Sequence, residues 1–239
     1  MEIRDSVAIV TGANRGLGRH FSTQLLERGA AKVYAGARDP KHVDVPGVVP
    51  LQLDITDPAS VARAAETARD ATLLVNNAGI STHTRLTDGD LDQIRLEMET
   101  GFFGTLAVTR AFAPVLAAGG GGAILNVLSV LAWAHFPDYG AYCSAKAAAW
   151  AQTNVVRQEL APQGIEVTAL HVGYMDTDMS DYVAQGEKPT QRSSPPRRST
   201  ASPPARRRSS PTSSPRASSS SSPRSRRSRE PTINVRRPI

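Results

Sequence analysis

The chain has 239 residues, a net charge of +6 and a single cysteine. This length is sufficient for one α/β domain with a full hydrophobic core, and one cysteine excludes an internal disulfide. No charged leader with an apolar core precedes the first expected strand, and the apolar tract 123–134 is short for a membrane span. We therefore expect a protein of the reducing cytoplasm.

The chain opens with a strand, a glycine-rich turn and a helix. Residues 7–10 form a continuous apolar run, which is typical of a strand buried on both faces of a parallel sheet. The spacing Gly-x-x-x-Gly-x-Gly follows at Gly12, Gly16 and Gly18, and helical spacing is clear over 20–28. Glycines let the backbone approach a pyrophosphate, and a helix N-terminus offers free N–H groups. This stretch predicts the first half of a dinucleotide-binding unit.

Strands and helices then alternate along the chain. We expect further strands over 32–37, 48–53, 73–75, 123–129 and 165–170. We expect helices over 58–69, with Asp57 as N-cap and Pro58 at the first position, over about 87–117, and over about 139–160. The fold class is therefore α/β, with a single doubly wound (Rossmann-type) parallel sheet of about six strands flanked by helices.

The second of these helices has a capping-box-like start and one apolar stripe. Thr87 and Asp90 begin it. The stripe comprises Leu91, Ile94, Met98, Phe102 and Leu106.

Three polar residues in the second half of the chain could carry chemistry. Tyr142 and Lys146 are four positions apart on an expected helix, so their side chains share one face. A nearby ammonium favours the phenolate and lowers the pKa of a phenol, which suits it to proton transfer. Ser129, at an expected strand end, could donate a hydrogen bond to a substrate oxygen. Hydride transfer between nicotinamide and a carbonyl needs a proton donor, a group that polarises the carbonyl and a group that anchors the cofactor, and these three residues could supply them.

Taken together, these motifs resemble those of the short-chain dehydrogenase/reductase family. The shared features are Thr11-Gly12 in the glycine turn, the segment Asn76-Asn-Ala-Gly79 and the spacing from Ser129 to Tyr142-x-x-x-Lys146. The resemblance extends from about residue 6 to residue 179. It implies that Tyr142 is the catalytic acid/base, that Lys146 lowers its pKa and binds the nicotinamide ribose, and that Ser129 orients the carbonyl.

The resemblance also implies a cofactor site. Asp54 would contact the adenine, Asn76 and Ala78 would line the adenosine side, and Thr177 would reach the carboxamide or phosphates. The full expected set is Gly12, Asn14, Arg15, Gly16, Leu17, Gly18, Arg38, Asp54, Ile55, Asn76, Ala78, Gly79, Tyr142, Lys146 and Thr177. The five histidines lack metal-ligand spacing, so we expect no metal site.

Charge favours NADP(H) over NAD(H) as the cofactor. An acid at the end of the second strand binds the ribose hydroxyls of NAD, whereas arginine accommodates a 2′-phosphate. Here that strand ends at Arg38, and Arg15 lies in the glycine turn. Two cations at one phosphate suit NADP(H). Asp39 is the counter-signal, and its alternative role is that of a turn residue before Pro40.

Two departures from the family pattern put the reaction rate in doubt. The family has an asparagine where this chain has Gly101, and a Pro-Gly pair where it has Val172-Gly173. The main hypothesis is an oxidoreductase acting on a small carbonyl or alcohol substrate. The alternative is a catalytically impaired dinucleotide-binding protein that senses cofactor ratio. Loop residues His83, Trp133, His135, Phe136 and Tyr174 are candidates for the substrate pocket.

The last part of the chain has a different composition. Residues 1–190 hold 15 Lys and Arg against 21 Asp and Glu, whereas residues 191–239 hold 13 Arg against one Glu. We expect a disordered Arg/Ser/Pro-rich tail over 191–239, after a domain at 1–190 that lacks the usual last strand and helix of the family.

Three interpretations of this tail stay open. It binds nucleic acid non-specifically, it is a solvated linker, or it results from a frameshift in a GC-rich gene, which is the interpretation that the abrupt change of charge favours. No membrane partner is expected, and a homo-oligomer is expected if the C-terminus permits.

Overall fold

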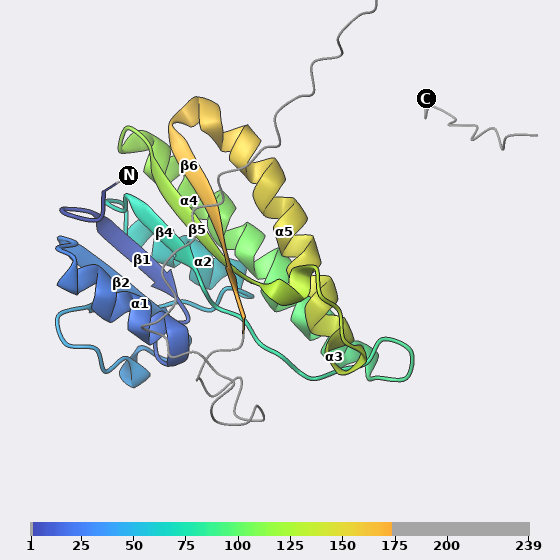
Figure 1. Cartoon of the computed structure of the whole chain (residues 1–239). Coiled ribbons are helices and arrows are strands. Elements are labelled where there is room, and N and C mark those ends of the chain that lie inside the picture. Colours follow the sequence, from blue (N-terminus) through green and yellow to red (C-terminus); the bar gives the residue numbers. More distant parts are fainter. Residues whose placement is uncertain (1, 174–239) are drawn as a thin grey trace, which may run out of the picture. The chain divides into compact units, whose positions relative to one another are not determined.

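A computed structural model describes residues 2–173 as one α/β domain with a parallel sheet (Figure 1). The strand order is β3-β2-β1-β4-β5-β6. The strands are β1 (Val7–Thr11), β2 (Lys32–Ala37), β3 (Val49–Gln52), β4 (Leu73–Asn76), β5 (Gly122–Ser129) and β6 (Ile165–Val172). The helices are α1 (Gly16–Glu27), α2 (Pro58–Thr67), α3 (Leu91–Met98), α4 (Thr105–Ala118) and α5 (Gly140–Leu160). The order confirms the predicted doubly wound sheet. Thr177, Tyr174 and the tail lie outside the described residues.

The helices cover the two faces of the sheet unequally. Helix α1 packs against β1 and β2 on one face, whereas α4 and α5 pack against β4, β5 and β6 on the other. Ile9 and Val10 are both fully buried because successive strand residues point to opposite faces. Ile9 packs with Phe112 of α4, and Val10 belongs to the core that includes Leu25 of α1. A continuous apolar strand is what a sheet covered on both faces requires.

Helices α1 and α2 begin in different ways. The Asp57 side chain accepts a hydrogen bond from the Ala59 N–H at 2.9 Å, and Pro58 occupies the first turn, as predicted. Helix α1 begins at Gly16, earlier than the apolar spacing indicated. It has no side-chain cap and no acidic residue in its first turn. Its first N–H groups therefore remain available to an anion.

The predicted long helix over 87–117 is interrupted in the structure. It starts at Leu91 with Asp90 as N-cap, so the proposed role of Thr87 was wrong. A π-helical segment over Glu99–Gly104 separates α3 from α4. Such segments shift the register of a helix.

The apolar stripe proposed for this helix is not its buried face. Leu91 is 62% exposed, whereas Glu97 and Thr100 are buried. In α4 the buried side chains are those of Val108, Phe112 and Leu116. By length and composition alone, 91–118 could cross a membrane, but these three residues lie in the core of the domain.

Candidate active site

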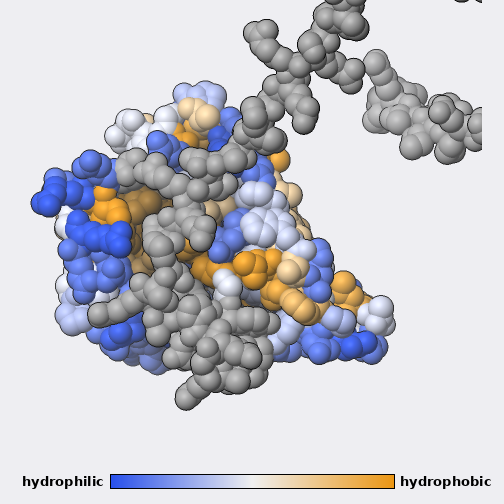
Figure 2. Space-filling model, viewed as in Figure 1, coloured by the Kyte–Doolittle hydropathy of each residue, from blue (hydrophilic) through white to orange (hydrophobic). Residues whose placement is uncertain are grey.

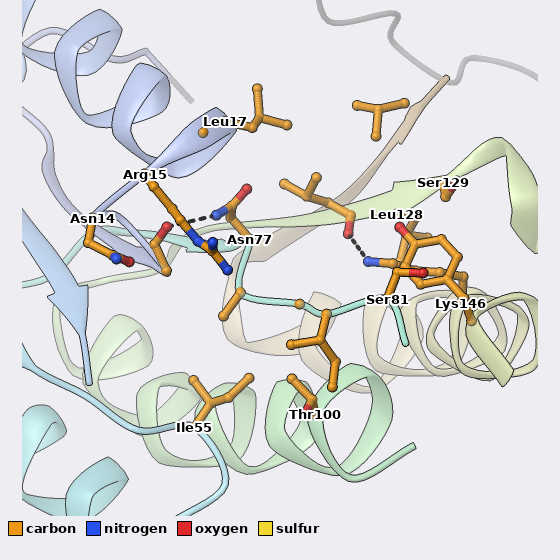
Figure 3. Close-up of a pocket in the computed structure, with 18 of the residues that line it drawn as sticks. Asn14, Arg15, Leu17, Ile55, Asn77, Ser81, Thr100, Leu128, Ser129 and Lys146 are labelled. Atoms are coloured by element: carbon orange, nitrogen blue, oxygen red, sulfur yellow. Dashed lines mark hydrogen bonds between the residues drawn. The ribbon is translucent and has the colours of Figure 1, made fainter. Parts of the chain in front are cut away.

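A cavity of about 730 Å³ lies at the carboxyl ends of the strands. This is the edge at which open parallel sheets bind ligands, near the reversal of strand order between β1 and β4. The predicted site residues that line it are Gly12, Asn14, Arg15, Gly16, Leu17, Arg38, Asp54, Ile55, Ala78, Gly79, Ser129, Tyr142 and Lys146. Figure 3 shows Asn14, Arg15 and Leu17 at one end of the cavity and Ser129 and Lys146 at the other.

The glycine turn forms the first wall of the cavity. Gly12 and Gly16 have φ values of +65° and +51°, a region in which L side chains are strained. A Cβ at Gly18 would collide with the Gly12 carbonyl oxygen, so the close contact of α1 with the turn requires glycine there. The turn thus brings backbone and the uncapped start of α1 to the cavity, which fits a dinucleotide pyrophosphate.

Hydrogen bonds fix this turn to the loop after β4. Thr11 Oγ1 accepts from the backbone N–H groups of Asn77 and Ala78, both at 2.9 Å. Asn77 Nδ2 donates to the Thr11 carbonyl oxygen at 2.9 Å and to the Gly12 carbonyl oxygen at 3.3 Å, and Figure 3 shows the second of these bonds. Two walls of the cavity therefore hold each other in place.

Asn76 does not line the cavity, contrary to the role we expected for it. It is 5% exposed and donates to Thr109 Oγ1 and Asn126 Oδ1, at 3.1 and 2.9 Å, so it joins β4 to α4 and β5. As the last residue of β4, it points into the domain, and Asn77 is the asparagine that reaches the cavity. Gly18 likewise does not line the cavity, and Thr177 lies outside the described residues.

Ser129, Tyr142 and Lys146 lie together at the other end of the cavity. Ser129 ends β5, and its Oγ accepts from the Leu131 N–H at 3.1 Å, which leaves its own hydroxyl hydrogen to donate. Tyr142 and Lys146 share one face of α5, as predicted, and Lys146 Nζ lies 5.5 Å from the Tyr142 ring centroid. A phenol, an ammonium and a hydroxyl thus line the same end of the cavity.

Burial controls the charge of Lys146. The residue is 8% exposed, and its Nζ donates to the Val127 carbonyl oxygen at 3.0 Å (Figure 3). Burial lowers the pKa of Lys146 from 10.5 to about 8, and the negative charge of Glu97 partly opposes this shift. An amine with a pKa near 8 can give up and regain a proton close to neutral pH.

The residues expected to select the cofactor lie at the adenosine end. Arg15, Arg38 and Asp39 all line the cavity. The Asp39 carboxylate accepts from the Lys41 N–H at 3.0 Å and caps a short helical turn that begins at Pro40. This is the turn role that we weighed against NAD binding. Arg38 makes no ion pair with any other residue in the range 2–173.

Some residues near the catalytic end were missed by sequence reasoning. Tyr139, Leu131, Ser81 and Thr100 line the cavity, and Glu97 is buried close behind it. Polar residues on a helix are expected to face solvent, so no signal in the sequence marked Glu97. Within the described residues, no group of three or more His, Cys, Asp or Glu could hold a metal ion.

Comparisons with known proteins agree with this arrangement. The family model "short chain dehydrogenase" matches residues 6–188. A short-chain dehydrogenase from Burkholderia cenocepacia, solved in complex with NADP, is 46% identical with a TM-score of 0.77, covering 80% of this chain and 81% of that one.

Two curated relatives are more distant. An uncharacterized oxidoreductase of Staphylococcus epidermidis is 28% identical over 78% of this chain and 85% of its own. An NADPH-dependent 1-acyldihydroxyacetone phosphate reductase of Schizosaccharomyces pombe is 31% identical over 74% of this chain and 62% of its own. The family match covers more than half of the chain and includes both ends of the cavity. The chain therefore belongs to the short-chain dehydrogenase family, and it is an NAD(P)-dependent oxidoreductase.

Proposed function

We propose that this protein transfers hydride between NADP(H) and an apolar ketone or its alcohol, with Tyr142 as the acid/base. One observation carries the proposal. Tyr142, with Lys146 Nζ at 5.5 Å from its ring centroid, lines the same cavity as the glycine turn. A nucleotide whose phosphates rest on that turn would extend toward these two side chains.

Each side chain has a separate task in this reaction. When bound, the nicotinamide group supplies or accepts the hydride. Tyr142 gives its phenolic proton to the substrate oxygen during reduction, and the Ser129 hydroxyl donates a hydrogen bond to the same oxygen. The Lys146 ammonium stabilises the phenolate that is left behind.

The preference for NADP(H) rests on two arginines. Arg15 and Arg38 line the adenosine end of the cavity, and guanidinium groups bind phosphate through paired N–H donors. The carboxylate of Asp39 is engaged by the Lys41 N–H, which reduces its suitability for ribose hydroxyls. The NADP complex of the Burkholderia relative supports this preference.

The substrate class follows from the loops around the catalytic end. Val130, Trp133 and Phe136, in the loop after β5, are 37%, 52% and 50% exposed, and Leu86 in the loop after β4 is 53% exposed. Figure 2 shows apolar surface between the lower ends of β6 and α5. Val130 lines the cavity, and large exposed apolar side chains in the loops around a site indicate a ligand that covers them. A ketone with an aromatic or long aliphatic substituent fits this surface.

The test is a panel of carbonyl compounds assayed with NADPH and with NADH. We expect turnover with NADPH and aromatic or long-chain ketones, and little with sugars or keto acids. Equal rates with both cofactors would refute the cofactor preference. A preference for charged or sugar substrates would refute the substrate class.

A nucleotide sensor without turnover is the second candidate. Gly101 supports it, because a glycine there supplies no side chain to the neighbourhood of Lys146. NADPH binding by calorimetry, combined with no oxidation by any member of the panel, would favour the sensor over the enzyme.

A further inference from the structure

Glu97 is an unusual residue for the end of helix α3. Its side chain is 1% exposed, although carboxylates are rarely buried without a partner for each oxygen. Oε1 accepts from the Thr82 N–H and from Thr82 Oγ1, both at 2.6 Å. Oε2 is buried and has no hydrogen-bond partner among the described residues. An unpaired buried carboxylate oxygen is unfavourable, so its retention points to a role.

The position of Glu97 connects it to the catalytic end of the cavity. Thr82 follows the loop that lines the cavity at Gly79 and Ser81. A Cβ added to Gly79 would lie 3.7 Å from Lys146 Nζ, so this loop runs directly past the lysine. Ser81 Oγ is a second buried oxygen without a partner. Two unsatisfied oxygens therefore lie on the elements that surround the Lys146 amine.

The helix that carries Glu97 also packs beside Lys146. A Cβ added to Gly101, one turn further on, would lie 3.1 Å from the Cβ of Ala145. Ala145 is the neighbour of Lys146 in α5. Glu97 and Lys146 make no direct ion pair within residues 2–173. A water molecule with three polar partners, namely Glu97 Oε2, Ser81 Oγ and Lys146 Nζ, would satisfy both orphan oxygens.

Burial drives the proton affinities of the two groups toward each other. The pKa of Glu97 is raised by burial, against the effects of its hydrogen bonds to Thr82 and of the charges of His83 and Lys146. The pKa of Lys146 is lowered to about 8, also by burial. A proton passes most readily between groups whose affinities are close. His83 and Lys146 are the charged groups that act on Glu97.

We propose that Glu97 is a positioning residue that returns protons to Lys146 through a bridging water, and so restores the Tyr142 phenol between turnovers. This inference rests on the proposed function. During reduction the Tyr142 O–H bond breaks as the alcohol O–H bond forms. The phenolate then takes a proton from the Lys146 ammonium. The Glu97 carboxylate takes a proton from bulk water and passes it through the bridging water to the neutral amine, which leaves Glu97 ionised again, so no charge accumulates over a cycle.

Two variants separate this role from a structural one. Glu97→Gln keeps an oxygen that accepts from Thr82 but cannot ionise, whereas Thr82→Val weakens the anchor and leaves the carboxyl group. We expect Glu97→Gln to lower kcat for ketone reduction about tenfold, less than the loss of a direct proton donor. We expect its NADPH dissociation constant to be unchanged. Thr82→Val should retain most of the turnover.

A second readout needs neither cofactor nor turnover. The chain has four lysines, so carbon-13 labelling of lysine resolves the titration of Lys146 by NMR in the free protein. The wild-type pKa of Lys146 is expected near 8, and Glu97→Gln should lower it because the nearby negative charge is gone. The fall of kcat with rising pH should move in the same direction.

The proposal is overturned if Glu97→Gln leaves the Lys146 pKa in place, or if Thr82→Val and Glu97→Gln lose the same turnover with unchanged pH profiles. A Tyr142→Phe variant is the separate control. Full turnover in Tyr142→Phe refutes the proposed function itself, whereas the lysine titration still reports on Glu97.

Discussion

The two ends of the cavity differ in the groups that form them. At the cofactor end, backbone in a glycine turn and the uncapped start of α1 line the cavity, and Arg15 and Arg38 are exposed. At the catalytic end, Lys146 and Glu97 are charged side chains held inside the domain. We therefore expect cofactor binding to depend on backbone geometry at the first end, and reactivity to depend on the exclusion of water from ionisable groups at the second.

Lys146→Met has the largest expected effect and acts on the catalytic end alone. The variant keeps the apolar length of the side chain but removes the charge that we propose stabilises the Tyr142 phenolate. We expect kcat/KM for ketone reduction to fall by about 10²–10⁴, the range for loss of acid–base assistance. Steady-state NADPH oxidation measures this, and near wild-type turnover would show that reactivity does not depend on the buried amine.

The same variant has a signature in stability. Because burial lowers the Lys146 pKa from 10.5 to about 8, the unfolded chain binds more protons between these values. Wild-type stability therefore rises with pH in this window, and the full burial penalty is present below pH 8. Lys146→Met should unfold at a higher temperature than wild type at neutral pH, with an advantage that shrinks toward pH 10.5. Thermal unfolding at several pH values checks this, and a constant difference would argue against the lowered pKa.

Gly18→Ala tests the cofactor end. The added methyl group would collide with the Gly12 carbonyl, so we expect loss of NADPH binding and a stability loss of about 1–3 kcal/mol. Gly119→Ala is the matched control, since a Cβ there meets only ordinary contacts at 3.5 Å and beyond. Calorimetric titration with NADPH measures the difference, and normal binding by Gly18→Ala would disprove the role of the turn.

Arg38→Ala should have a smaller and more selective effect. Loss of one contact to the 2′-phosphate should weaken NADPH binding about tenfold, roughly 1.4 kcal/mol, with NADH binding unchanged. Arg63→Ala removes another exposed guanidinium, which pairs with Asp57 outside the cavity, and it serves as the control. An equal loss of affinity for NADPH and for NADH would show that Arg38 does not contact the 2′-phosphate.

Asp57→Ala should leave both ends of the cavity intact. The loss of its 2.9 Å hydrogen bond to the Ala59 N–H should reduce stability by about 1 kcal/mol. Urea denaturation measures the change, and activity at saturating NADPH should be that of wild type. A large loss of activity would show that α2 and the cavity are coupled.

Much of the fold could be predicted from the sequence, because its signals are local. The apolar run of β1, the Asp57-Pro58 start of α2 and the Tyr142-Lys146 spacing each depend on neighbouring residues. The π-helical segment over Glu99–Gly104 could not be predicted, because it depends on packing against α5.

The candidate site divides in the same way. The glycine turn was found from its spacing, whereas the roles of Asn76 and Asn77 depend on which way each side chain points at the end of β4. The importance of Glu97 depends on burial by segments distant in sequence. No pattern in the α3 sequence distinguishes this residue from the exposed acids beside it.

The most direct test of the account is Tyr142→Phe, which removes one hydroxyl group and retains the ring. We predict that this variant binds NADPH with wild-type affinity and reduces the best ketone of the panel at least about 10²-fold more slowly. Wild-type turnover by Tyr142→Phe would contradict the claim that this phenol, beside a buried amine, is the proton donor.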